Sequence, residues 1–216
     1  MLDFVIIVAS CDRLFSGLQN RELLQNLLAS VTKARDELEP STITGRRPRL
    51  VLKVAPDLEE SQIVDIAELI RSSNIDGVIV SNTTISRPAS LRDRKSCRHC
   101  FFPKPHRCDV IANKSETGGL SGVPVKPLTL HVLKTLRTHL PSSIPLIGCG
   151  GISTGADVLE YGRAGASLIQ VYTSFGYDGA GTCRRIKDEL ESLLRAENTT
   201  WKAVVDHSVK KLSWTE

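Results

Sequence analysis

The sequence has no long hydrophobic run and no strong charge of one sign. Its apolar stretches, such as Val5–Ala9, stop far short of the ~20 residues that a membrane-spanning helix needs, so we expect no segment to cross a bilayer. The 28 Lys and Arg residues barely exceed the 24 Asp and Glu residues, and they are dispersed, which argues against a nucleic-acid-binding protein. The N-terminus has no basic region and no small-residue cleavage site, so we expect no signal peptide.

Cysteine is also sparse. Six cysteines in 216 residues, three of them close together, do not resemble a secreted disulfide framework, and we expect reduced thiols. What remains is ordinary globular composition, 41% apolar and 24% charged, at a length that suits one domain or one and a half. A hydrophobic core can be built at this size.

Short β-branched runs alternate with longer segments of helical periodicity. The predicted strands are Phe4–Ala9, Leu50–Val54, Gly77–Ser81, Pro145–Gly148 and Ser167–Tyr172. The predicted helices are Arg21–Leu38, Glu59–Ser72, Leu128–His139, Gly155–Ala164, Ala180–Arg195 and Thr200–Lys211. The strands are continuous apolar runs, as expected when both faces of a sheet are covered. The pattern predicts an α/β fold with a parallel sheet and helices outside it.

Each predicted strand after the first ends in polar or glycine-rich residues. Lys53 is the last residue but one of the predicted strand Leu50–Val54. The three later strands lead into Ser81–Thr84, Gly148–Gly151 and Tyr172–Ser174. A (β/α)8 barrel builds its site in this way across several strands, whereas a doubly wound sheet concentrates it at one switch point. The run from Gly148 also fails the dinucleotide fingerprint, because Ser153 replaces its third glycine. We therefore favour the barrel.

The segment Gly150–Asp157 joins a predicted strand to a helix. Its glycines let the backbone approach a ligand closely, and a helix N-terminus offers unpaired N–H groups to an anion. Barrels often hold phosphate in the loops after their last two strands, which here are this loop and Tyr172–Ser174. We expect a phosphate site between them. The alternative is a tight strand-to-helix turn with an ordinary cap.

Three further features suggest a ligand. Lys53 lies inside an apolar strand, where a charge is costly unless it is paired, so we expect it to face a ligand or to form a Schiff base. Asn82 and the adjoining Thr83–Thr84 supply amide and hydroxyl groups that suit a planar polar substrate. Glu116–Gly122 is a second glycine-rich loop, although such clusters are usually plain connections.

Five segments, in order and spacing, resemble the dihydroorotate dehydrogenase family, in particular its membrane-associated, quinone-reducing class. They are LVLKVAPDL (50–58), DGVIVSNTTISRP (76–88), ETGGLSG (116–122), PLIGCGGISTGADVLEYGRAGASLIQVYT (145–173) and the flanking helices. The resemblance implies a (β/α)8 barrel that binds FMN, takes a hydride from dihydroorotate to give orotate, and passes electrons to ubiquinone. It also implies the mitochondrial inner membrane, reached through segments absent from this chain.

The resemblance assigns roles to individual residues. It places Lys53 against the flavin ring, Ser81 and Asn82 where flavin and orotate meet, and Thr83 on orotate. The remaining flavin contacts that it implies are Ser121, Gly122, Gly150, Gly151, Tyr172 and Thr173, the last four around the phosphate. These roles agree with the in-strand cation and the glycine-rich anion site inferred from the residues themselves.

The first departure from the family is incompleteness. The strand at Phe4–Ala9 matches the fourth of eight, so about five of eight strand–helix units are present, and five strands cannot close such a barrel. We expect a partial FMN-binding barrel over 1–212, with an inserted loop at about 92–113 and a tail at 213–216. Its edge strands would be apolar and unpaired.

This incompleteness leaves the activity of the chain open. We expect it to be a truncated form with weak activity or none. The alternatives are a non-catalytic remnant that binds phosphate or flavin, and a Schiff-base lyase that uses Lys53.

The second departure lies at the catalytic base. In register with the family, Cys11 takes the place of the serine that removes the substrate proton, and a shift by one would place Ser10 there. A thiol is a better proton acceptor than a serine hydroxyl. The family's two ligand-holding asparagines are replaced by Val8 and Arg13, so a segment with no working base is the alternative.

The third departure is the insertion, which carries Cys97, Cys100, His106 and Cys108. These residues have the ligand chemistry of a zinc knuckle, but a single CxxC is a weak signal and a basic loop is the plainer interpretation. Near the C-terminus, Trp201 and Trp214 are expected to pack the last helix onto the barrel wall.

Overall fold

The structure, a computed structural model, describes residues 4–8, 21–88 and 118–214 of the 216. Several predicted residues lie outside these ranges, namely Ser10, Cys11, Cys97, Cys100, His106 and Cys108. The proposed base and the zinc candidate therefore stay predictions. None of the described helices combines the length and apolar character needed to cross a membrane.

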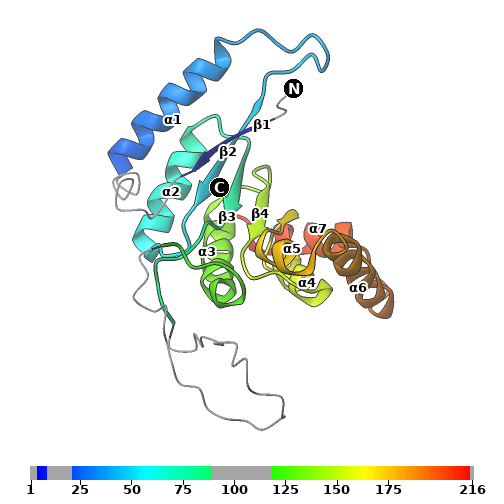
Figure 1. Ribbon diagram of the computed structural model, residues 1–216. Helices are drawn as coiled ribbons and strands as arrows, with labels where there is room; N and C mark the ends of the chain where they lie inside the picture. The colour runs from blue at the N-terminus through cyan, green and yellow to red at the C-terminus, as the bar shows by residue number, and fades with distance from the viewer. Residues whose placement is uncertain (1–3, 9–20, 89–117, 215–216) are drawn as a thin grey trace.

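The described residues contain one five-stranded sheet, and all of its neighbouring strands are parallel (Figure 1). The strands are β1 Phe4–Val8, β2 Arg49–Val54, β3 Gly77–Val80, β4 Leu146–Cys149 and β5 Leu168–Gln170. Their order in the sheet is the order of the chain. A doubly wound sheet reverses its order at a switch point, whereas a barrel does not. The topology is therefore that of a partial β/α barrel, as predicted.

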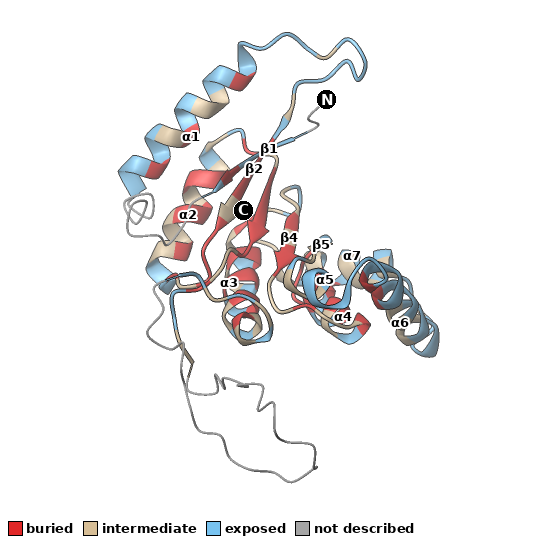
Figure 2. Cartoon of the chain, viewed as in Figure 1, coloured by how far each residue is buried: buried red, intermediate tan, exposed pale blue. Residues whose placement is uncertain are grey.

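Helices alternate with the strands as far as β5, and three described helices follow it. The helices are α1 Arg21–Asp36, α2 Glu60–Ser72, α3 Lys126–His139, α4 Gly155–Arg163, α5 Thr173–Asp178, α6 Thr182–Ala196 and α7 Trp201–Leu212, with a 3-10 turn η2 at Val123–Val125. Helices α3 and α4 pack against the sheet, whereas α6 and α7 pack on α4. Buried residues concentrate on the central strands β2, β3 and β4 and on helices α2 and α3 (Figure 2). This main core joins Leu52 of β2 and Val78 of β3 to Ile63 of α2 and Leu133 of α3.

The other face of the sheet forms a second, smaller cluster from Val51, Ile79 and Cys149. Successive side chains of a strand point to opposite faces, so Lys53 shares this inner face with Val51. The register pairs Lys53 with Ile79, and Cys149 with Gln170 on β5. The strand pattern therefore turns a cation and an amide toward the concave interior of the partial barrel.

The two edge strands are apolar and poorly covered, as the sequence predicted. Phe4 and Val8 of β1 are exposed, and so is Leu168 of β5. Unpaired, apolar edges of this kind favour association with other strands.

Two details at the C-terminal end test the predicted elements. The last strand ends at Gln170 rather than Tyr172, and the short helix α5 that follows was not predicted. The interpretation of the tryptophans is confirmed. The Trp201 ring lies so close to Gly162 of α4 that an added Cβ there would fall 2.6 Å from it, and the Arg71 guanidinium of α2 lies 4.7 Å from the centroid of the Trp214 ring.

Candidate functional site

A cavity of about 1300 Å³ opens at the carboxyl ends of the strands. Its walls come from β2, from the loops after β3, β4 and β5, and from the segment around η2. The predicted ligand contacts all line it, namely Lys53, Ser81, Asn82, Thr83, Ser121, Gly122, Gly150, Gly151, Tyr172 and Thr173. The fold thus brings together residues spread over more than half of the chain.

Lys53 is half-buried on the inner face of β2 and lines this cavity. Within the described ranges no carboxylate pairs with its ammonium group. Its charge acts on Cys149, whose pKa is raised by burial and pulled down in part by this lysine. An unpaired cation in a partly apolar wall is costly, so the position suits a ligand that carries negative charge or electron density.

The loop after β3 is attached to its neighbours through its backbone. The Ser81 N–H donates to the Cys149 carbonyl at 2.6 Å, and the Asn82 N–H donates to the Val54 carbonyl at 2.8 Å. The buried Ser81 hydroxyl already lies 2.7 Å from the Thr129 hydroxyl. Ser81, Asn82 and Thr83 all line the cavity, and the Ser81 hydroxyl does so while bonded to Thr129.

The second glycine-rich loop packs directly on this polar pair. Thr84 and Leu120 exchange two backbone hydrogen bonds, of 3.0 and 2.7 Å. Gly119 lies so close to Thr83 that an added Cβ would fall 2.1 Å from its hydroxyl oxygen. Asp57, just after β2, accepts hydrogen bonds from Thr84 and from the two residues that follow it. The loops after β2 and β3 and the segment before η2 therefore form one rigid wall.

Gly150 and Gly151 form the floor of the cavity beneath β4. Their φ angles of 140° and 66° lie where residues with side chains are strained. An added Cβ would fall 2.7 Å from the Thr129 hydroxyl at Gly150, and 2.7 Å from the Lys126 Cβ at Gly151. Only glycine fits here. In the described part of the chain, no partner accepts a hydrogen bond from either backbone N–H.

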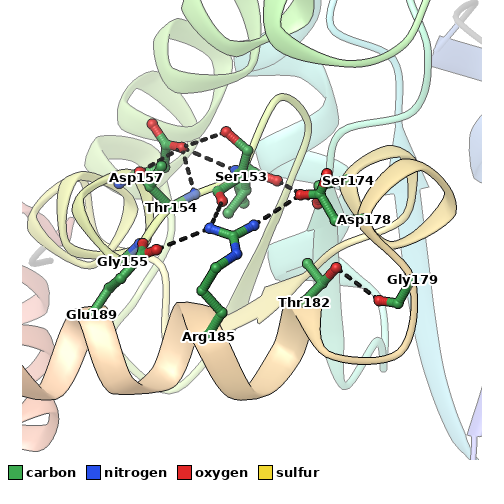
Figure 3. A network of polar contacts seen from close by, with 11 residues as sticks. Ser153, Thr154, Gly155, Asp157, Ser174, Asp178, Gly179, Thr182, Arg185 and Glu189 are labelled. Carbon is green, nitrogen blue, oxygen red and sulfur yellow. Dashed lines mark hydrogen bonds and ion pairs between the residues drawn. The ribbon is translucent and has the colours of Figure 1, made fainter.

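The start of α4 does not provide the free N–H groups that the sequence analysis expected. The Asp157 carboxylate accepts from the N–H groups of Ser153 and Thr154, each at 2.9 Å (Figure 3). The next N–H, that of Gly155, donates to Glu189 of α6 at 2.7 Å. Internal carboxylates already occupy this helix end, because Asp157 stands at the third helical position, where it can fold back. An anion site here has to use the glycines before the helix instead.

The groups around the Asp157 carboxylate, which caps the start of α4, stabilise its ionised form. Burial by itself would raise the pKa of Asp157, but hydrogen bonds from Lys126, from the Ser153 backbone and from Thr154 outweigh it and lower that pKa to about 2. The Lys126 ammonium lies 2.5 Å from Asp157 and 2.6 Å from Glu160. The carboxylate is therefore an ionised, fully engaged structural group.

The loops after β4 and β5 lie side by side. The Ser174 hydroxyl donates to the Ile152 carbonyl at 2.8 Å, which joins α5 to the residue after the paired glycines. Tyr172 and Thr173 therefore approach Gly150 and Gly151 at the same end of the cavity. The loops after β4 and β5 are therefore adjacent, as the sequence analysis expected.

Gln170 is a cavity residue that the sequence analysis missed. It lines the cavity from β5, and its side-chain oxygen is buried with no hydrogen-bond partner among the described residues. The signal was available, because a polar residue inside an apolar strand was the argument used for Lys53. Tyr177 and Asp178 of α5 were missed for a different reason, since that helix was not expected.

A polar cavity at the carboxyl edge of parallel strands, lined by the loops of successive strand–helix units, defines a ligand-binding protein of the β/α-barrel class. The family model described as dihydroorotate dehydrogenase matches residues 5–194. The chain belongs to the dihydroorotate dehydrogenase family.

Individual relatives agree with this family. The mitochondrial dihydroorotate dehydrogenase (quinone) of Schizosaccharomyces pombe is 44% identical over 181 residues, covering 84% of this chain and 36% of that protein. The mitochondrial one of Mus musculus is 39% identical, covering 88% and 44%, and the dihydroorotate dehydrogenase (quinone) of Rhodospirillum rubrum is 39% identical, covering 91% and 48%. The chain therefore spans less than half the length of these relatives.

Solved structures show the same relationship. The ligand-free DHODH of Eimeria tenella superposes with a TM-score of 0.80 at 32% identity, covering 95% of this chain and 56% of that one. The complex of the Eimeria tenella DHODH with ferulenol gives a TM-score of 0.79. The parallel sheet and its flanking helices thus correspond to part of a larger barrel.

Proposed function

We propose that this chain forms the flavin- and substrate-binding part of an FMN-dependent dihydroorotate dehydrogenase that passes electrons to quinone. The observation that carries the proposal is one cavity in which Lys53, which pairs with no carboxylate of the described residues, meets the glycines Gly150–Gly151 and the polar pair Asn82–Thr83. The relatives named above support the reaction and the quinone acceptor.

The residues of the cavity fit FMN. Gly150 and Gly151 offer two backbone N–H groups for which the described residues provide no acceptor, which suits a phosphate. Tyr172 and Thr173 would complete this phosphate end. Lys53 and the buried oxygen of Gln170 lie on the inner face of the sheet, where they would meet the flavin ring. Ser121 and Gly122 would cover it from the opposite loop.

Bound there, FMN would supply a hydride acceptor for dihydroorotate and a donor for the quinone. Asn82 and Thr83 would hold the substrate through amide and hydroxyl hydrogen bonds. Cys11, or Ser10 in the alternative register, would take the substrate proton. We also propose the mitochondrial inner membrane as its location, on the basis of the mitochondrial relatives.

Flavin titration tests the proposal. Addition of FMN to the purified chain should quench flavin fluorescence and leave visible flavin absorbance on the protein after gel filtration. Riboflavin, which lacks the phosphate, should bind more weakly. If no flavin stays bound at tens of micromolar FMN, the proposed site is wrong.

The second candidate is a non-catalytic remnant that binds phosphate or flavin, a function that requires only the cavity. It predicts FMN binding without orotate formation when dihydroorotate and a quinone are supplied. Wild-type chain and Cys11→Ala should be compared, because only a working base makes the two differ. Borohydride trapping of a carbonyl substrate on Lys53 would instead indicate the Schiff-base lyase.

A further inference from the structure

Arg185 of α6 touches both loops that meet at the proposed phosphate end. Its guanidinium donates to the Ser153 carbonyl at 3.0 Å, in the loop after β4, and to the Asp178 carboxylate at 2.8 Å, at the end of α5 (Figure 3). It also pairs with Glu189, four residues on, at 2.9 Å. One side chain from outside the cavity thus links two segments of its wall.

The same face of α6 holds the start of α4. Glu189 accepts from the Gly155 N–H at 2.7 Å, and α6 approaches so closely that an added Cβ at Gly155 would fall 2.3 Å from the Leu190 backbone nitrogen. Arg185 therefore bonds the Ser153 carbonyl and Glu189 the Gly155 amide, while Asp157 accepts from the amides of Ser153 and Thr154 in the same loop. Among the described residues, the N–H groups of Gly150, Gly151 and Ile152 then have no acceptor.

Arg185 also contributes its positive charge, which pairs with the carboxylates of Asp178 and Glu189. Asp178 lines the cavity, whereas Arg185 does not. Without the guanidinium, the carboxylates of Asp178 and Glu189 would stand unpaired near the place proposed for a dianionic phosphate, and like charges repel.

We propose that Arg185 is a positioning residue for the phosphate of the bound flavin: it holds the loop after β4 against α5 and neutralises the Asp178 carboxylate that faces the cavity. This inference rests on the proposed function. It concerns a residue that lies outside the cavity and touches no proposed ligand atom.

The test compares the dissociation constants of FMN and riboflavin for the full 216-residue chain, because only FMN carries the phosphate. Arg185→Gln should weaken FMN binding about tenfold and leave riboflavin within about twofold. Arg185→Lys should recover part of the loss, since it restores the charge without the planar fork. Adding Asp178→Asn to Arg185→Gln should also recover part, because it removes the exposed negative charge.

Arg184→Gln is the matched control. Arg184 neighbours Arg185 on the same helix and pairs with Asp188, but it is 83% exposed and contacts neither loop. Its replacement removes the same charge and should leave both affinities unchanged. Asp178→Asn alone should fold and bind FMN at least as tightly as wild type, which keeps the charge argument testable if Arg185→Gln does not fold.

Three results would overturn the inference. Equal losses for FMN and riboflavin in Arg185→Gln would indicate a general structural role, and an unchanged FMN affinity would indicate none. Weaker FMN binding in Asp178→Asn would contradict the charge argument. A wild-type chain that binds neither flavin would instead overturn the proposed function, and the role of Arg185 with it.

Discussion

The Tyr161 hydroxyl of α4 donates a 2.6 Å hydrogen bond to the carbonyl oxygen of Gly150 in the cavity floor. Its ring is fully buried and lies over Gly148 of β4, where an added Cβ would fall 2.4 Å from it. Burial of this phenol raises its pKa well above the usual range, so it stays a neutral donor. The helix thus fixes the turn of the glycine loop from behind, through a contact made outside the cavity.

Tyr161→Phe should therefore destabilise the chain without creating a large void. The ring remains, but the Gly150 carbonyl loses its donor, and we expect a loss of about 1–2 kcal/mol in the free energy of unfolding, measured by urea denaturation. Tyr177→Phe is the control, because Tyr177 is 88% exposed and its change should be neutral. Equal stability of Tyr161→Phe and wild type would contradict the assigned role.

Gly118 and Gly119 are adjacent in the second glycine-rich loop, but only Gly119 lies against Thr83, so alanine at each position tests that contact. Gly119→Ala forces a methyl group against Thr83, whereas Gly118→Ala meets nothing within 4 Å. We expect Gly119→Ala to weaken orotate binding to the FMN-loaded chain by about tenfold, since roughly 1.4 kcal/mol is lost when Thr83 is displaced. Gly118→Ala should bind orotate like wild type. Isothermal titration gives both affinities, and equal values for the two variants would refute the contact.

The Asp157 carboxylate that caps α4 should make the free energy of unfolding depend on pH in the acid range. The pKa of Asp157 falls from 3.8 to about 2 on folding, so its contribution is complete above the unfolded value and is lost as pH drops toward 2. After screening by solvent, we expect about 1–2 kcal/mol at neutral pH. Asp157→Asn should lose that amount at pH 7 and approach wild type near pH 2.

Denaturation curves at several pH values check this prediction. Asp206→Asn, in an exposed pair with Lys202, should match wild type throughout. A stability gap between Asp157→Asn and wild type that stays constant with pH would show that the cap does not titrate as described.

Most of the fold was accessible from the sequence. Continuous apolar runs separated by helical periodicity predicted the strands and the main helices within a few residues, because local pattern reports which face of each element is buried. The short helix α5 was not predicted, because six residues beginning at Thr173 are too few to show a helical period. The barrel was favoured over a doubly wound sheet from the chemistry at the strand ends, and the sequential strand order confirms it.

The site was predicted as a set of residues but not as an arrangement. Lys53 and Gln170 both interrupt apolar strands, yet only the lysine was noticed, because a charge is a stronger signal than an amide. The free N–H groups were expected at the start of α4. Asp157 and Glu189 occupy them, and Glu189 lies on another helix, 34 residues from Gly155, that no local pattern connects to this loop.

Taken by itself, the sequence determined the α/β class and the family, and it predicted a set of residues that line the cavity, since these depend on local periodicity and on short motifs. The tertiary structure alone decided which backbone donors stay available and what holds them. Hydrogen-bond partners such as Arg185 with Ser153, or Tyr161 with Gly150, are set by how helices pack on strands. That packing depends on contacts between distant segments, and a buried donor takes the acceptor that the fold brings within reach.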